Sequence, residues 1–171
     1  MNRVVIVMGV ATFALMGSCL AAEHGTARIK GTKPDSPLSG TATFTPAGDG
    51  LRVSVQVKHA PPGTHGIHIH EHGSCDDSGN AAGGHYNPDG SHHGFLPKDH
   101  FTGAHAGDFG NIKVGPNGTG HLTLTLPGLT LGGKSHDVLG HAVILHEKAD
   151  DFGQPTGNAG ARIGCGVITA N

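Results

Sequence analysis

The chain lacks tryptophan and is poor in aromatic and charged side chains. Aromatic residues make up 4% and charged residues 14% of its 171 residues. The 13 acidic side chains slightly outnumber the 11 basic ones, for a formal net charge of −2. No run of basic residues marks a nucleic-acid footprint or a polybasic membrane patch. The composition therefore excludes nucleic acid as an expected partner.

A helical period is also absent over any useful length, whereas glycine is abundant, with 30 residues. Apolar and polar residues instead alternate along Leu51–Lys58 and His121–Leu126, and more weakly over residues 27–30, 41–45 and 112–114. This alternation is typical of half-buried antiparallel strands. Short strands separated by glycine and proline turns predict an all-β domain, a β-sandwich or flattened barrel. Residues 72–108 and 147–160 resist strand assignment, and loops of that length are usually functional.

The first 22 residues read as a signal peptide rather than as part of the fold. Met1-Asn2-Arg3 gives a positively charged start, residues 4–20 are mostly apolar, and Ala21-Ala22 supplies small residues before a polar segment. We expect cleavage near Ala22, which leaves residues 23–171 as one domain. Two alternatives remain open: Cys19 is acylated as in a lipoprotein, or the apolar stretch stays as a membrane anchor. Export is common to all three.

Cysteine is scarce: only Cys75 and Cys165 remain once the expected leader is removed. An oxidising compartment favours a disulfide between them over two buried free thiols. The bridge would tie the loop after His70 to the final strand. No C-x-x-C motif is present, so a redox-active disulfide is not expected.

Histidine, in contrast, is frequent and arranged for metal binding, with 15 residues in the chain. His68 and His70 form an H-x-H pair, which aims both rings to one face of a strand. Further candidates follow in or beside the long loops: His85, His93, His105, Asp108 and, at the end of a strand over residues 142–146, His146. Three imidazoles with one carboxylate suit zinc, and histidines around an open position suit a redox copper.

A single histidine is ordinarily a surface or hydrogen-bonded residue. We expect that ordinary role for His24, His59, His100, His121 and His136. That ordinary role does not account for the whole set of candidates. A histidine-rich metal buffer does not account for it either, because a buffer would show contiguous histidines. The candidates are instead spread over strands and loops and framed by glycine and aspartate.

The chain resembles the copper/zinc superoxide dismutases from about residue 27 to 168, with every motif in the family's order. The motifs are Gly66-Ile67-His68-Ile69-His70-Glu71, Gly84-His85-Tyr86-Asn87-Pro88, His93-Gly94, His105-Ala106-Gly107-Asp108, His146-Glu147-Lys148-Ala149-Asp150-Asp151, Gly157-Asn158-Ala159-Gly160-Ala161-Arg162 and Cys165-Gly166-Val167-Ile168. The resemblance implies an eight-stranded Greek-key β-barrel, with the metals held outside the barrel wall by two long loops.

The resemblance also implies one copper and one zinc per subunit and a role for each motif residue. His85 would serve both ions as a bridging imidazolate. Asp150 would link the rings of two ligands, and Arg162 would sit beside the open copper position as a fixed cation for a small anion. His65 matches a family histidine with a structural role. The implied copper ligands are His68, His70, His85 and His146, and the implied zinc ligands are His85, His93, His105 and Asp108.

The implied reaction converts superoxide to oxygen and hydrogen peroxide by copper redox cycling, with zinc structural. His85 and Arg162 would be the catalytic residues, the first by carrying a proton when the bridge opens. The alternative is a non-enzymatic copper chaperone or metal-storage protein of the same fold. Such proteins tend to lack part of the copper set or the arginine, and both are present here.

The chain departs from the eukaryotic members of the family at two points. Cys75 lies only five residues after His70, which resembles the bacterial periplasmic branch, and His72 stands where the eukaryotic dimer places a hydrophobic contact. We therefore expect a homodimer by a non-eukaryotic interface, or a monomer. The expected location is the periplasm, with a protein lipid-anchored through Cys19 or an extracellular protein as the alternatives.

Overall fold

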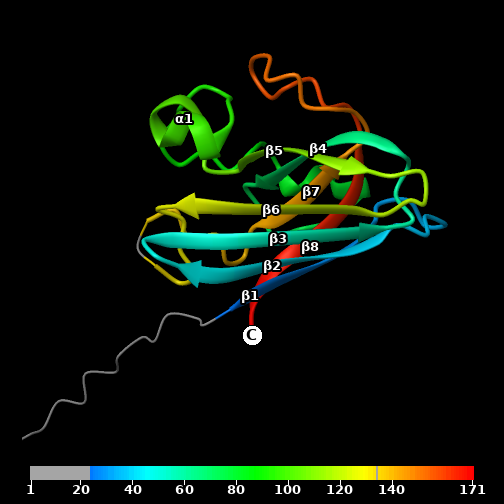
Figure 1. Ribbon diagram of the computed structural model, residues 1–171, viewed down its shortest axis with the longest axis horizontal. Coiled ribbons are helices and arrows are strands. Elements are labelled where there is room, and N and C mark those ends of the chain that lie inside the picture. The colour runs from blue at the N-terminus through cyan, green and yellow to red at the C-terminus, as the bar shows by residue number, and fades with distance from the viewer. Residues whose placement is uncertain (1–23, 134) are drawn as a thin grey trace, which may run out of the picture.

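A computed structural model describes residues 24–133 and 135–171. Eight antiparallel strands form a closed barrel in the order β1-β2-β3-β6-β5-β4-β7-β8 (Figure 1). No helix in the described ranges is both long and apolar enough to cross a membrane. The strands are β1 (Gly25–Gly31), β2 (Ser39–Ala47), β3 (Gly50–Lys58), β4 (Gly63–His70), β5 (Asp108–Val114), β6 (Gly120–Pro127), β7 (Ala142–His146) and β8 (Arg162–Ala170).

The strand order confirms the predicted Greek-key barrel. β3 pairs with β6, and β4 pairs with β5 on one side and β7 on the other. The chain therefore crosses between non-neighbouring strands twice, from β3 to β4 and from β6 to β7. These crossings place β4, the strand with the H-x-H motif, between the strands that begin at Asp108 and end at His146.

The barrel interior is built from the alternation visible in the sequence. Along β3, the residues Leu51, Val53, Val55 and Val57 are each no more than 2% exposed, while their neighbours face outward. Phe44 on β2 and equivalent apolar positions of the other strands complete the core. Each fully buried side chain of this size stabilises the fold by about 1.5–3 kcal/mol. The predicted strand pattern is thus confirmed.

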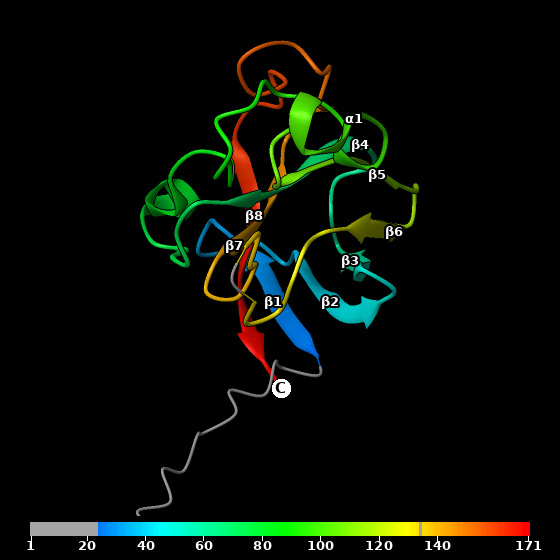
Figure 2. The same cartoon turned by 90° about the vertical axis from the view of Figure 1, so that its left-hand side faces the viewer.

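The first long loop is not structureless, and this corrects the sequence interpretation at two points. It contains a 3-10 helix, η1 (Asp77–Ala82), and a short α-helix, α1 (Leu96–Gly103). It also ends one residue early, because Asp108 already belongs to β5. Only Leu96 of α1 is buried, so no amphipathic period marked it. In Figure 2, α1 and the loop after β7 lie together above the barrel.

Cys75 and Cys165 form the predicted disulfide, with their Cα atoms 5.7 Å apart. The bridge joins the segment before η1 to β8 across a separation of 90 residues. It anchors the first long loop to the barrel.

Replacing both cysteines by serine should lower the unfolding free energy by about 3–4 kcal/mol, because the unfolded chain regains the entropy of a long loop. Denaturant titration of the oxidised wild type beside the double variant measures this difference. A Ser54→Ala variant, outside the bridge, is the control. A double variant as stable as wild type would show that the bridge is dispensable.

Candidate metal centre

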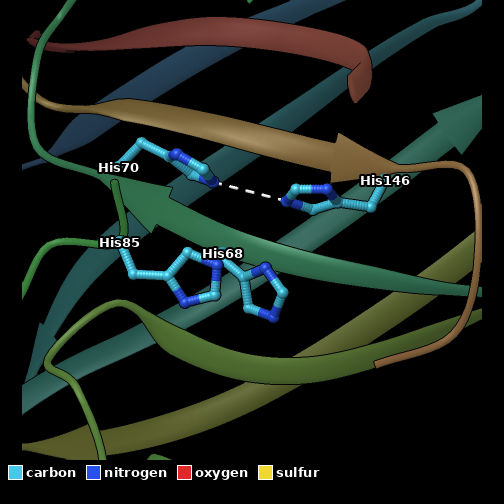
Figure 3. A group of neighbouring side chains, drawn as sticks. All are labelled: His68, His70, His85 and His146. Carbon is cyan, nitrogen blue, oxygen red and sulfur yellow. Dashed lines mark hydrogen bonds between the residues drawn. The ribbon is translucent and has the colours of Figure 1, made fainter. Parts of the chain in front are cut away.

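One group of four imidazoles gathers around β4. His68 and His70 are 0% and 1% exposed and lie beside β7, which ends at His146. A β-bridge between His70 and His85 brings the loop onto the end of the same strand. The four rings converge in Figure 3, where His70 and His146 point their Nε2 atoms at each other, 3.3 Å apart. One nitrogen from each of the four lies within 4.8 Å of the others.

A second group shares His85 with the first. It consists of His85, His93, His105 and Asp108, again with ligand atoms within 4.8 Å of one another. Asp108 is fully buried, and its Oδ1 lies 2.8 Å from His85 Nδ1 and 3.2 Å from His105 Nδ1. Its Oδ2 lies 3.0 Å from His93 Nδ1. Three imidazoles around one carboxylate form the donor set that suits zinc.

In three rings of the first group, the nitrogen that points away from the group lies at hydrogen-bonding distance from an oxygen atom. His70 Nδ1 donates to Gly83 O at 3.0 Å, and His146 Nδ1 donates to Gly160 O at 3.2 Å. His68 Nε2 lies 2.8 Å from an oxygen of Asp150. Because each ring donates outward, its other nitrogen carries a lone pair, and that lone pair faces the group.

One buried ligand nitrogen of the first group, His68 Nδ1, has no hydrogen-bonding partner in the described part of the chain. In the second group, His93 Nδ1 faces Asp108 Oδ2 at 3.0 Å without forming a hydrogen bond of good geometry. A buried polar atom left unpaired costs about 1–3 kcal/mol, so such atoms are rare unless a ligand satisfies them. The donor sets and these two nitrogens fit one metal ion in each group.

Asp150 connects the two groups, as the resemblance implied. Its two oxygens lie 2.8 Å from His68 Nε2 and 3.0 Å from His93 Nε2. Gly157 leaves room for this bridge: its φ is +76°, and a Cβ there would lie 1.9 Å from Asp150 Oδ1. Glycine is thus required at this position for both backbone conformation and space.

Burial keeps three rings of the first group, those of His70, His85 and His146, neutral at physiological pH. Burial, reinforced by the charge of His85, lowers the pKa of His70 to about 2. Burial lowers the pKa of His146 to about 3, and that of His85 to about 4 against the opposing hydrogen bond to Asp108. Neutral imidazole is the form that binds metal, so these rings need lose no proton at neutral pH.

The second group behaves differently, because carboxylates surround it. Burial acts to lower the pKa of His93, but the adjacent carboxylates of Asp108 and Asp150 outweigh it and raise that pKa to about 9. Burial would raise the pKa of Asp108, yet the rings of His105, His85 and His93 against its oxygens hold that pKa far below its usual range. Metal binding at this group therefore releases a proton from His93 at pH 7.

Arg162 opens β8 beside the first group. It donates to the carbonyls of Asn80 at 3.3 Å and Gly83 at 2.6 Å, the latter being the carbonyl that accepts from His70. Its charge lowers the pKa of both His70 and His146, although burial is the larger cause. Arg162 thus places a positive charge next to the predicted copper ligands and fixes η1.

The remaining histidines lie outside both groups. His24, His59, His92, His100 and His121 are exposed. His136 pairs with Asp89 at 2.7 Å. His65 is buried, with its ring nitrogens 2.9 Å from His146 O and 2.8 Å from Pro61 O, which fits the structural role expected of it.

Three residues near the site were missed by the sequence analysis. His141 Nδ1 lies 3.2 Å from His70 O, and the ring packs on Tyr86. The Asn111 side chain exchanges two hydrogen bonds with the main chain of Asp150, at 2.8 and 2.9 Å. Gln154 does the same with the main chain of His93, at 2.8 and 3.1 Å. No sequence signal distinguishes these amides from surface polar residues.

Gln154→Ala should weaken zinc binding about tenfold, within the range found for partners that orient metal ligands. The amide holds the main chain of His93, so its loss should loosen that ligand while leaving the first group intact. Competition with a chromophoric zinc chelator measures the change, with Gln56→Ala on the outside of β3 as the control. Equal zinc affinities for the two variants would contradict the positioning role.

Comparison with known proteins agrees with the geometry. The family model for copper/zinc superoxide dismutase (SODC) matches residues 38–168. The chain is 35% identical over 165 residues to the superoxide dismutase [Cu-Zn] of Deinococcus radiodurans, covering 91% of this chain and 90% of that protein. The crystal structure of the clock protein EA4 is similar, with a TM-score of 0.79, 34% identity, and coverage of 89% of this chain and 97% of that one. The chain belongs to the copper/zinc superoxide dismutase family.

Proposed function

We infer that the chain is a superoxide dismutase that uses one copper and one zinc per subunit. The observation that carries this is the sharing of His85 between two buried donor groups, the first of which contains an imidazole nitrogen, His68 Nδ1, without a hydrogen-bonding partner among the described residues. Family membership supports the same activity. We propose His68, His70, His85 and His146 as the copper ligands and His85, His93, His105 and Asp108 as the zinc ligands.

In this reaction one superoxide loses an electron and leaves as oxygen, and a second takes up that electron with two protons to become hydrogen peroxide. Copper, when bound, supplies the one-electron acceptor and donor, while zinc supplies a fixed positive charge. The ligand rings around copper are locked from outside by Gly83, Gly160 and Asp150, so they need not reorient during the cycle.

His85 is the residue we propose to deliver a proton. Its Nδ1 faces Asp108 at 2.8 Å, which leaves Nε2 for the first group. Burial lowers its pKa to about 4, so a proton held on this ring passes readily to a peroxide anion. The second proton comes from water.

Arg162 is the residue we propose to attract the substrate. Superoxide is a small anion, and the guanidinium is a cation that does not deprotonate at physiological pH. Its attachment to the main chain of Gly83 and Asn80 keeps that charge beside the copper ligands. The complete ligand set together with this arginine disfavours a copper chaperone or metal store.

Superoxide consumption by the metal-loaded protein tests the function. Protein loaded with both copper and zinc should consume superoxide rapidly, and protein loaded with zinc alone should not. The zinc-only sample shares the fold and its charge, so it controls for any non-catalytic effect. Stoichiometric binding of both metals without activity would instead support a metal carrier.

We further propose that the protein is exported and belongs to the bacterial branch. The position of Cys75 and the Deinococcus relative support that branch. The expected signal peptide over residues 1–22, including Cys19, lies outside the described residues. We propose cleavage near Ala22 and a periplasmic location, which mass spectrometry of the mature N-terminus in a periplasmic extract would test. A lipid on Cys19 would instead show membrane attachment.

We propose a monomer, or a homodimer whose interface differs from the eukaryotic one. The support is His72, which is exposed in this chain and stands where the eukaryotic dimer places a hydrophobic contact. Sedimentation of the metal-loaded protein distinguishes the two states.

A further inference from the structure

The outward face of β1, β2, β3 and β6 carries basic residues and no acidic ones. Arg28 and Lys30 project from β1, and Arg52 and Lys58 project from β3, all four exposed. Lys113 on the adjoining β5 is also exposed. The remaining outward positions of these strands are mostly threonine, serine and glutamine, with His121 and, at the ends of β2 and β6, Ala47 and Pro127. We call this surface the basic sheet face.

The cations of this face have no internal partners. Among the described residues, none of the five lies within 4.0 Å of a carboxylate oxygen, the distance that defines an ion pair. Most of the described carboxylates instead lie in the loops around the metal centre and in turns. A protein that is near neutral overall therefore separates its charges, and one side of the barrel has a positive field that reaches about one Debye length of 8 Å in physiological salt.

The strand register arranges these side chains in rows across the sheet. One row runs Lys58–Ser39–Lys30, and the next runs His121–Gln56–Thr41–Arg28. With strands about 4.8 Å apart, the rows extend for about 10 and 14 Å. The first row thus places a hydroxyl between two lysines, and the second places an amide and a hydroxyl beside Arg28, at spacings that one extended polymer can follow.

The surface is hollowed along these rows. One hollow is lined by Gln56, Lys58, Lys113 and His121 among others, and a neighbouring hollow shares Gln56 and Lys58 with it. A third includes Arg28 and Thr26 and a fourth includes Arg28 and Lys30. A single ligand can therefore contact basic residues on several strands.

The types of side chain on the basic sheet face indicate which class of anionic partner it can bind. Single-stranded nucleic acid needs aromatic platforms, and a membrane surface is held most firmly by inserted apolar side chains. The outward positions of these strands carry no phenylalanine, tyrosine, tryptophan or long aliphatic side chain. Among the described residues, the large hydrophobic side chain that is exposed is Phe152, in the loop after β7. Hydroxyl and amide groups interleaved with cations suit a ligand that carries both sugar hydroxyls and negative charges.

We propose that the basic sheet face binds an extended acidic polysaccharide, running across the strands with its carboxylates on the cations. β1, β2 and β3 lie on the side of the barrel away from the loop after β7 (Figures 1 and 2). The metal centre therefore remains open while the polymer is bound. This binding is independent of the proposed enzymatic activity.

Fluorescence anisotropy with a labelled oligogalacturonate tests the proposal on the metal-loaded protein. Wild type should bind at low ionic strength, and salt should weaken the binding steeply, since neutralising polymer charges releases counterions. The double variant Lys30→Gln/Lys58→Gln should bind about tenfold or more weakly, because two cations are lost from one row. Its superoxide consumption should match that of wild type.

Lys98→Gln/Lys148→Gln is the matched control, because it removes the same charge from the loops on the other side. It should retain wild-type affinity for the oligogalacturonate. An equal loss in both double variants would show a general charge effect and overturn the proposal. So would absence of binding by wild type, or binding to vesicles with 30% anionic phospholipid that exceeds binding to the polymer.

Discussion

His146→Ala should abolish superoxide consumption, lowering it by at least a hundredfold, while the protein keeps its fold and its zinc. Loss of partners that merely orient a ligand costs about 10–100-fold in metal affinity or activity, so loss of a ligand should cost more. His146 belongs to the first donor group alone, and its Nε2 faces His70 Nε2 at 3.3 Å. Copper content and activity should therefore fall together, and zinc content should not change.

His146→Ala should remove copper without disturbing the fold, because the main chain at the end of β7 has its own contact. The main-chain oxygen of His146 accepts from His65, and this contact survives truncation of the side chain. The activity loss would therefore report the missing imidazole rather than a displaced strand. Metal content, activity and far-ultraviolet circular dichroism should be measured beside His121→Ala, an exposed histidine on β6. Unchanged activity in His146→Ala would refute the assignment of the copper ligands.

The converse variant separates the two groups. Asp108→Ala should lose zinc, because Asp108 is the single carboxylate among the proposed zinc ligands and lies against three imidazoles. Measured together, the copper and zinc contents of the two variants show whether each group binds its own metal independently of the other.

How much of this could be predicted from sequence differs between the barrel and the loops. The alternation over residues 51–58 predicted β3, because side chains on a strand change face at every residue. The H-x-H spacing likewise predicted that His68 and His70 share a face, and the structure gathers both into one group. Such patterns are local, so the sequence displays them directly.

The loop contacts could not be predicted in the same way. Asn111 binds the main chain of Asp150 from 39 residues away, and Gln154 binds that of His93 from 61. In the sequence, an amide side chain that hydrogen-bonds to the main chain of a distant residue looks like any surface polar residue. Asn111 lies on β5 and Gln154 in the loop after β7, and only the folded chain brings them to Asp150 and His93. α1 escaped notice for a related reason, since its interruption at His100, with φ of 54°, leaves too few turns for a period to appear.

The metal-free protein should lose stability steeply on acidification. The pKa values of His70, His85 and His146 are lowered to about 2, 4 and 3, chiefly by burial, whereas in the unfolded chain they lie near 6.5. Between pH 6.5 and about 4 the unfolded chain therefore binds up to three more protons than the folded one. The contribution of these three groups to the free energy of unfolding is therefore complete above pH 6.5. Below pH 6.5 the free energy of unfolding decreases by up to about 4 kcal/mol per pH unit.

His93 should limit stability on the alkaline side. The carboxylates of Asp108 and Asp150 raise its pKa to about 9 in spite of burial, so the folded protein holds a proton there that the unfolded chain loses above pH 6.5. This contribution is complete below pH 6.5 and is lost as the pH rises through about 9. The metal-free protein should thus be most stable close to pH 6.5, between the two effects.

Urea titrations of the metal-free protein from pH 4.5 to 9.5 measure both slopes. In His70→Gln/His146→Gln, two of the three depressed groups are absent, so the acid slope should fall to about one third, while the alkaline slope should persist. An acid slope unchanged in that variant would place the labile groups elsewhere. Loading with copper and zinc should flatten both limbs, because the metals occupy the same nitrogens for which protons compete. The burial that keeps these imidazoles neutral for metal binding is thus the same feature that makes the metal-free fold sensitive to acid.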